Sequence, residues 1–431
     1  MTLVRPEQSD RLDTKTGIIV FAAFAAAYFC SALLRAITAT LSPVLTQDFA
    51  LQARDLGLLA GGYFLGFAAT QLPLGTWLDR YGPKRVILCF LSLAVLGSVA
   101  FSMATSFAWL LGARVLVGMG VSACLMAPLT GYRRWFDVPT LLRANSWMLM
   151  TGSLGMLSST LPVQWLLPLL GWRSLFWIMA ALLLLSMLAI AWLVPAWRDV
   201  LAPAGANVHA VGPLGKSPEG NLAGGYAEIW RNRYFQRMSP LAFFNYGGMI
   251  AVQTLWAAPW MVKVAGYTAL EAATGLFFIN AAMLVTFWGW GMLNPLLARR
   301  GWHTGRLLAW GVPVSLVVLA FNIAAGPSTG WVGWALFCMS SSVMGLLQPA
   351  VGMAFREALA GRALSGFNLV IFSGVFVVQW GIGLLIDAFQ SAGLSQLVSY
   401  QCAMGVFLCC CIASYAYFVG GATATVDNLQ P

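Results

Sequence analysis

Long runs of apolar residues, separated by short polar intervals, dominate the pattern along this chain. Each run is close to the roughly 20 apolar residues that a helix needs to cross a bilayer. Because lipid offers the backbone no hydrogen-bond partners, we expect every run to be an α-helix. The sequence therefore predicts an all-α membrane protein with twelve transmembrane helices, at 17–42, 56–77, 86–105, 107–129, 144–168, 174–195, 238–263, 272–297, 305–325, 330–353, 363–387 and 394–420.

The composition excludes a soluble domain and offers no chemistry typical of an enzyme. Hydrophobic residues make up 60% of the chain and charged residues only 9%, whereas soluble domains carry about 25% charged residues. The eight cysteines lie within apolar runs without a C-x-x-C pair, and both histidines lie in intervals. No constellation of His, Cys and carboxylate residues converges within the predicted helices. We therefore expect no catalytic site, no metal site and no cofactor.

The net charge of +10 follows the predicted topology. Nineteen of the 24 lysines and arginines fall in alternate intervals and in the N-terminal segment. By the positive-inside rule these intervals, and with them both termini, are cytoplasmic. We expect a multi-pass protein of a cell (inner) membrane, in contact with lipid and not with nucleic acid.

A long polar interval divides the chain into two similar parts. Arg80-Tyr81-Gly82 and Arg299-Arg300-Gly301 lie in matching intervals at an offset of 219 residues, and Arg143 and Arg362 repeat that offset. Asp79, in contrast, is matched by Ala298, so the second copy has lost its acid. The predicted parts are a six-helix half at 1–195, a cytoplasmic linker with an interfacial helix at 196–237, a second six-helix half at 238–421 and a cytoplasmic tail at 422–431.

The interval between the second and third runs carries the pattern G-x-x-x-D-R-x-G-x-[KR]-[KR], from Gly75 to Arg85. With twelve helices in two halves, this pattern resembles the loop signature of the major facilitator superfamily of secondary transporters. The resemblance implies that the stretch latches the cytoplasmic side. Asp79 would then face the N-terminus of a neighbouring helix, which favours an acid, and Arg80 and Arg85 would supply partner charges. The candidate gating residues are Gly75, Asp79, Arg80, Gly82 and Arg85.

Two arginines, Arg35 and Arg114, lie inside predicted helices at similar depth. Ionisable residues in a bilayer are costly, so they mark functional sites by default. No acidic residue lies deep in any run, which leaves both cations without an evident partner. Arginine binds carboxylate and phosphate through paired hydrogen bonds. The resemblance places both residues at the central cavity; alternatively, Arg35 reaches outward and Arg114 has a structural or coupling role.

We expect Gln253, Trp256 and Asn280, in the second half, to line the same site, although each could instead be a packing contact between helices. The predicted function is secondary or facilitative transport, by alternating access, of a small organic anion or zwitterion. A symporter or an antiporter fits, and we expect a monomer. The alternatives are an exporter of drugs or metabolites, although helix five lacks the Gly-Pro pair of drug antiporters, and a sensor that binds ligand without moving it.

Overall fold

The computed structural model describes residues 12–195 and 222–421, and every regular element in these two ranges is a helix. The prediction of an all-helical bundle is confirmed. The helices are α1 (Thr14–Phe49), α2 (Ala53–Ala69), α3 (Gln71–Ser102), α4 (Phe107–Val121), α5 (Ala123–Trp135), α6 (Val138–Ser158), α7 (Leu161–Leu193), α8 (Leu222–Arg231), α9 (Arg233–Leu241), α10 (Gly247–Ala251), α11 (Ala257–Lys263), α12 (Ala269–Arg299), α13 (Thr304–Ala325), α14 (Trp331–Ser341), α15 (Leu347–Met353), α16 (Glu357–Ser391) and α17 (Gln396–Gly420).

These elements account for the twelve predicted spans. Within the described residues, nine helical segments are individually long and apolar enough to cross a bilayer. The second span consists of α2 and the start of α3, and the fifth of α6 and the start of α7. The seventh runs from α9 through α10 to α11, with π-helical turns at Ala242–Tyr246 and Val252–Trp256. The chain therefore forms a multi-pass membrane protein.

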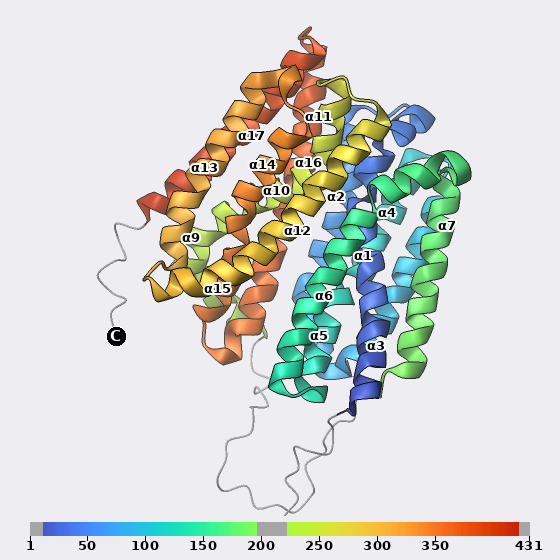
Figure 1. Cartoon of the computed structure of the whole chain (residues 1–431), viewed down its shortest axis with the longest axis vertical. Coiled ribbons are helices and arrows are strands. Elements are labelled where there is room, and N and C mark those ends of the chain that lie inside the picture. Colours follow the sequence, from blue (N-terminus) through green and yellow to red (C-terminus); the bar gives the residue numbers. More distant parts are fainter. Residues whose placement is uncertain (1–11, 196–221, 422–431) are drawn as a thin grey trace, which may run out of the picture.

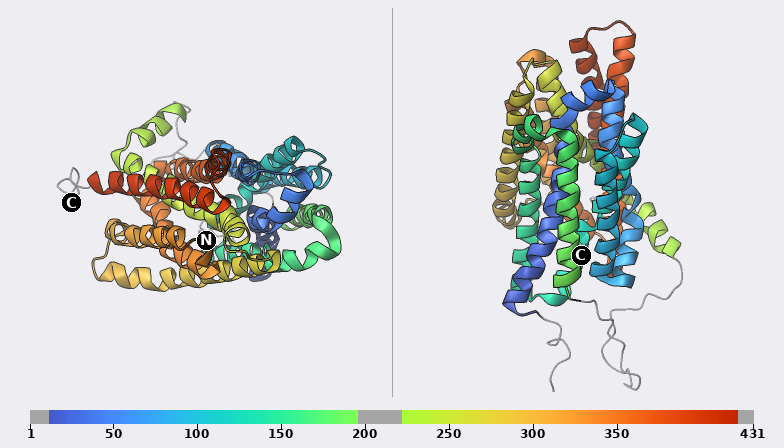
Figure 2. Two further views of the ribbon diagram at one scale, coloured as in Figure 1. Left: turned by 90° about the horizontal axis from the view of Figure 1, so that it is seen from above. Right: turned by 90° about the vertical axis from the view of Figure 1, so that its right-hand side faces the viewer.

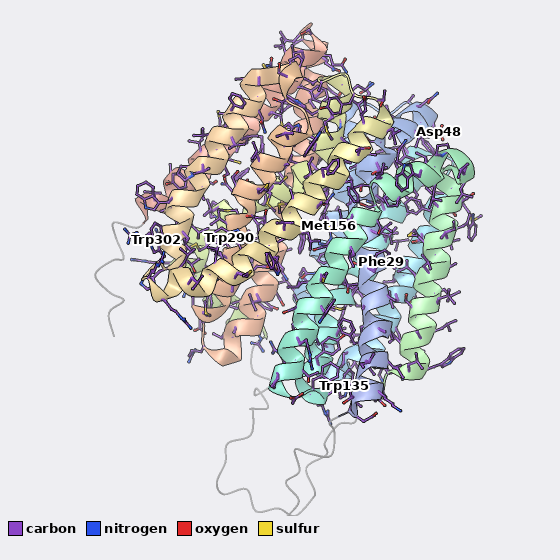
Figure 3. The ribbon with its side chains drawn as sticks, in the orientation of Figure 1. Phe29, Asp48, Trp135, Met156, Trp290 and Trp302 are labelled. Atoms are coloured by element: carbon purple, nitrogen blue, oxygen red, sulfur yellow. The ribbon has the colours of Figure 1, made fainter. Side chains whose placement is uncertain are left out.

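The helices gather into two groups that lie side by side (Figures 1 and 2). Figure 1 shows α1–α7, coloured blue to green, beside α9–α17, coloured yellow to red. We call the end of the bundle where α1 begins the Thr14 side and the opposite end, where α1 finishes, the Phe49 side. Figure 3 labels Trp135 near the Thr14 side and Asp48 near the Phe49 side. Parts of the predicted linker (196–221) and the predicted tail (422–431) lie outside the described residues.

The charged stretch from Gly75 to Arg85 differs from the loop that its composition predicts. Helix α3 runs through almost all of it and is interrupted only at Gly82, where φ is 74° and ψ is 161°. Gly301, at the offset of 219 residues, turns with the same φ of 74°. Glycine adopts this conformation without steric cost. Both copies of the repeat therefore turn at an equivalent glycine.

Close approach at glycines fixes how α2 sits between its neighbours. A methyl group on Gly118 of α4 would overlap the Tyr63 carbonyl oxygen of α2. On the other flank, a methyl group on Gly57 would overlap the carbonyl oxygen of Gln379 in α16. Small residues permit such packing in membranes, where no hydrophobic force drives helices together. Helix α2 therefore packs tightly both on α4 of its own group and on α16 of the other.

Candidate functional site

Arg114 is a fully buried cation in α4 with most of its donor groups unused. The side chain is 0% exposed, and Nη2 donates a hydrogen bond to Thr38 Oγ1 of α1. Its Nε and Nη1 atoms are buried without a hydrogen-bond partner. An unsatisfied buried donor costs about 1–3 kcal/mol, and more when it is charged. Within the described residues, one hydroxyl therefore holds the Arg114 guanidinium, and its Nε and Nη1 atoms have no acceptor.

Arg35 of α1 is only partly buried as a whole residue. Its Nε is buried without a partner, and its guanidinium carbon lies 5.8 Å from the centre of the Phe67 ring. The phenol groups of Tyr28, Tyr63 and Tyr246 are within electrostatic reach. Tyr246 belongs to a π-helical turn of the second group, so both groups of helices contribute to the surroundings of Arg35.

One face of α2 brings the two arginines into a common cluster. The guanidinium carbon of Arg114 lies 5.1 Å from the centre of the Tyr63 ring, a distance typical of a cation–π contact. Tyr63 and Phe67 are one turn apart and stack with their ring centres 6.2 Å apart. The Tyr63 hydroxyl donates to the Ser31 carbonyl oxygen over 3.3 Å, which fixes the ring. We call Arg35, Arg114, Tyr63 and Phe67 the arginine cluster.

An aromatic side chain from the second group completes this face. Phe372 of α16 lies with its ring centre 4.4 Å from that of Phe67 and 6.1 Å from that of Phe64. Within the described residues, no ion pair involves Arg35 or Arg114. The cluster therefore combines two cations that lack a carboxylate with a set of aromatic rings.

The three predicted residues of the second group take part in two separate hydrogen bonds between helices. Gln253 Nε2 donates to Asn280 Oδ1 over 3.0 Å, and Trp256 Nε1 donates to the Gln379 carbonyl oxygen over 3.0 Å. All four residues are buried. Gln253 and Trp256 lie in the π-helical turn Val252–Trp256, which packs against α1. Such turns are frequent at functional sites. The structure thus places Gln253 and Trp256 in a turn that packs against α1, the helix that bears Arg35.

The candidate gating residues contact the second group at the Thr14 side. A methyl group on Gly75 would lie 3.6 Å from Ser365 Oγ of α16. The cations within electrostatic reach of Asp79 are Arg362, near the start of α16, and Arg133. These cations are not the expected partners, Arg80 and Arg85. The Arg80 guanidinium carbon lies 5.4 Å from the centre of the ring of its neighbour Tyr81. Arg85 is exposed.

Two further contacts support the helix ends at the Thr14 side. Lys84 Nζ, within the charged stretch, donates to the Val194 carbonyl oxygen over 2.6 Å and so caps the end of α7. Tyr226 of α8 donates to the Leu72 carbonyl oxygen over 3.3 Å. Burial raises the pKa of the Tyr226 phenol, which keeps it a neutral donor. Both contacts tie distant segments to the ends of neighbouring helices.

The two arginines stand out in the sequence, whereas the aromatic residues around them do not. The spacing of Tyr63 and Phe67 places both on one helical face, which was the available signal. It could not show that this face meets α1 and α4. Phe372 carried no signal at all, because its role depends on the pairing of α2 with α16.

Comparisons with known proteins agree with this architecture. A family model described as the Major Facilitator Superfamily matches residues 24–379. A solved structure of a bacterial homologue of the human lysosomal transporter Spinster, in an inward-facing and occupied conformation, superposes with a TM-score of 0.78 at 16% identity. That match covers 97% of this chain and 100% of the other, and at this identity it shows the fold alone.

Three curated relatives have different cargoes in their names. A gallate transporter of Pseudomonas putida is 26% identical and covers 81% of this chain and 83% of its own length. The 4-hydroxybenzoate transporter PcaK of Acinetobacter baylyi is 24% identical over 59% of this chain and 61% of its own. The multidrug resistance protein MdtL of an Escherichia coli strain is 30% identical over 86% and 88%, respectively. The family match, the relatives and the twelve-helix fold together show that this chain belongs to the major facilitator superfamily of transporters.

Proposed function

We propose that this transporter moves a small organic anion and that Arg35 and Arg114 receive its carboxylate. The observation that carries the proposal is the set of buried guanidinium nitrogens without acceptors: Nε of Arg35, and Nε and Nη1 of Arg114. A carboxylate has two oxygens that can accept several hydrogen bonds from such donors. It would satisfy the unused donors and neutralise part of the buried charge.

The rings of the arginine cluster favour an aromatic carboxylate over an aliphatic one. The ring centre of Phe67 lies 5.8 Å from the Arg35 guanidinium carbon, and Phe372, from the opposite group of helices, packs against Phe67. Flat rings pack well on aromatic side chains in offset or edge-on arrangements. The gallate and 4-hydroxybenzoate transporters among the relatives are named for acids of this kind. An aromatic acid would use the cations and the rings of this site together.

Access to the site would alternate between the two faces of the membrane as the two groups of helices rock against each other. The distribution of Lys and Arg supports a cytoplasmic position for the Thr14 side and for both termini. Tyr246 and Phe372 reach the arginine cluster from the second group. A substrate bound there would therefore contact both moving parts, as alternating access requires.

Uptake of radiolabelled 4-hydroxybenzoate into proteoliposomes tests this proposal. We expect flux in the wild type and a loss of about a hundredfold in Arg35→Ala and in Arg114→Ala, since each removes a charged donor from a desolvated site. Arg173→Ala is the matched control, because Arg173 also lies over an aromatic ring, Trp172 at 4.2 Å, but is half exposed. Unchanged flux in both cluster variants would contradict the assignment.

Export of lipophilic drugs is the second candidate function. The 30% identity to a multidrug resistance protein over most of both chains favours it. Drug export should persist in Arg35→Ala, because a lipophilic cation gains nothing from a guanidinium. Flux of an organic cation that survives both arginine substitutions, with no flux of any carboxylate, would favour export over the proposed function.

A further inference from the structure

At the Phe49 side, the end of α16 contacts the beginning of α2 through a single carboxylate. The Ala53 backbone N–H donates to Asp387 Oδ1 over 3.1 Å, and the Arg54 backbone N–H donates to Asp387 Oδ2 over 2.9 Å. Asp387 lies in α16 of the second group, whereas Ala53 and Arg54 open α2 of the first. This contact therefore joins the two parts that must move apart during transport.

The physics of helix ends makes this contact favourable. The first backbone N–H groups of a helix have no partner within the helix, and the helix dipole attracts negative charge to that end. A carboxylate that accepts two of these N–H groups satisfies both at once. The Arg54 guanidinium takes no part, since it lies 3.6 Å from Asp55. Asp387 thus recognises the backbone of α2 and not a side chain.

Helix α2 also has a cap from one of its own residues. This local cap is distinct from the contact that Asp387 makes between the two groups of helices. Asp55 Oδ2 accepts the Gln52 backbone N–H over 3.1 Å. The two carboxylates therefore serve different donors at the same helix end. Asp55 stabilises α2 whatever the second group does, whereas the contact of Asp387 exists only when the two groups meet.

The backbones of α2 and α16 approach closely beside this contact. A methyl group on Gly383 of α16 would overlap the Ala53 carbonyl oxygen, as one on Gly57 would overlap the Gln379 carbonyl oxygen. Hydrogen bonds to a carboxylate weaken steeply with distance and misalignment. A small separation of these two helices at the Phe49 side would therefore break both bonds to Asp387.

The opposite ends of the same two helices carry an analogous arrangement. At the Thr14 side, Asp79 follows the second span and lies within electrostatic reach of Arg362, near the start of α16. There, the amide of Asn368 also donates to Gln71 Oε1 over 3.3 Å. Asp79 lies in α3, which continues the second span, and the group within its electrostatic reach is a side chain, whereas Asp387 accepts two backbone N–H groups of α2. An acid of one group of helices therefore lies near the beginning of a helix of the other group at each side of the membrane.

We propose that Asp387 is a latch that holds the Phe49 side closed by capping α2 from the opposite group of helices, and that it releases when this side opens. The latch sets the balance between the two access states and does not touch the substrate. It does not depend on the identity of the cargo. Its test therefore needs no substrate and remains valid if the proposed function is wrong.

The distance between spin labels at Arg54→Cys and Gln390→Cys, both exposed positions beside the latch, measures opening directly. The exposed native cysteines, Cys89 and Cys409, are replaced by serine in this background. We expect a short distance to dominate when Asp387 is present. In Asp387→Ala, the ratio of the long-distance to the short-distance population should rise about tenfold, as for the loss of a strong helix cap. Asp387→Asn keeps the shape but not the charge, and should give an intermediate rise.

Two variants serve as matched controls. Asp55→Ala removes the local cap of the same helix, and Glu271→Gln removes a carboxylate that accepts the Thr268 backbone N–H of its own segment, 2.8 Å away. Both should leave the population ratio at the wild-type value. Asp387→Glu, which retains the charge, covers the case in which Asp387→Ala does not fold and should stay close to the wild type. An unchanged ratio in Asp387→Ala and Asp387→Asn, or an equal rise in Asp55→Ala, would overturn the latch.

Discussion

At the scale of single residues, the arginine cluster brings together two cations, and within the described residues neither of them forms an ion pair. A bilayer protein retains such cations at a cost of at least a few kcal/mol each. The Arg114 guanidinium has one protein acceptor, Thr38 Oγ1, and presents its remaining buried nitrogens unpaired. If Arg114 receives the carboxylate as proposed, Thr38 would be a positioning residue, because its hydroxyl accepts a hydrogen bond that orients the Arg114 guanidinium.

Replacing Thr38 by valine keeps the shape of the side chain and removes only the acceptor. We expect the affinity for an aromatic carboxylate to fall about tenfold, because the guanidinium loses the bond that orients it. Isothermal titration calorimetry on the purified protein measures this change. Thr38→Ser should restore the affinity.

A neighbouring threonine provides the control for that substitution. The Thr40 hydroxyl donates to the Ser159 carbonyl oxygen over 2.7 Å and does not contact Arg114. Thr40→Val should therefore bind the ligand as the wild type does. Equal losses in Thr38→Val and Thr40→Val, or no recovery in Thr38→Ser, would argue against the positioning role.

Only some residues of the arginine cluster can be recognised from the sequence. Arg35 and Arg114 stand out because charge inside an apolar run is rare. Their aromatic neighbours do not stand out, since Tyr63, Phe67 and Phe372 are ordinary membrane residues until helix pairing is known. Arg362, which lies within electrostatic reach of Asp79, carries no such signal either, because it is distant in sequence and approaches Asp79 only through the pairing of α3 with α16.

At the scale of helices, the apolar runs predicted the spans well but not their ends. Helix α3 continues through the charged stretch and is interrupted only at Gly82. The fourth span extends to Trp135 of α5, beyond its apolar part. Composition marks where a chain is apolar, whereas backbone hydrogen bonds determine where a helix stops.

Helix packing around α2 makes a sharp prediction at Gly118. Gly118→Ala should destabilise the protein by about 2 kcal/mol, because the added methyl group forces α4 away from the Tyr63 backbone. The same displacement moves the ring that lies under Arg114. Thermal unfolding in detergent, followed by intrinsic fluorescence, measures the loss of stability.

The same helix supplies the control. An added methyl group on Gly112 of α4 would meet nothing within 4 Å, and alanine favours the helix over glycine. Gly112→Ala should therefore unfold at the wild-type temperature or slightly above it. A similar loss of stability in both variants would mean that close packing on α2 is not the cause.

At the scale of the whole molecule, the pair α2 and α16 joins the two groups of helices along its length. Aromatic rings from Phe64, Phe67 and Phe372 occupy the middle, beside the arginine cluster. Asp387 lies at one end and Asp79 near the other. The helices α2 and α16 thus connect the arginine cluster to both ends of the pair. A ligand that draws Phe372 toward Phe67 would therefore also act on the proposed latch at Asp387.

On the proposed function, the carboxylate of the substrate accepts hydrogen bonds from the unpaired donors of Arg35 and Arg114. The most direct test compares two ligands of nearly the same shape, 4-hydroxybenzoate and 4-hydroxybenzamide, by calorimetric titration of the wild-type protein. Only the acid offers a charged acceptor to the guanidiniums, so we predict that it binds about a hundredfold more tightly than the amide. Equal affinity for the acid and the amide would contradict the assignment of Arg35 and Arg114 as the residues that receive the carboxylate.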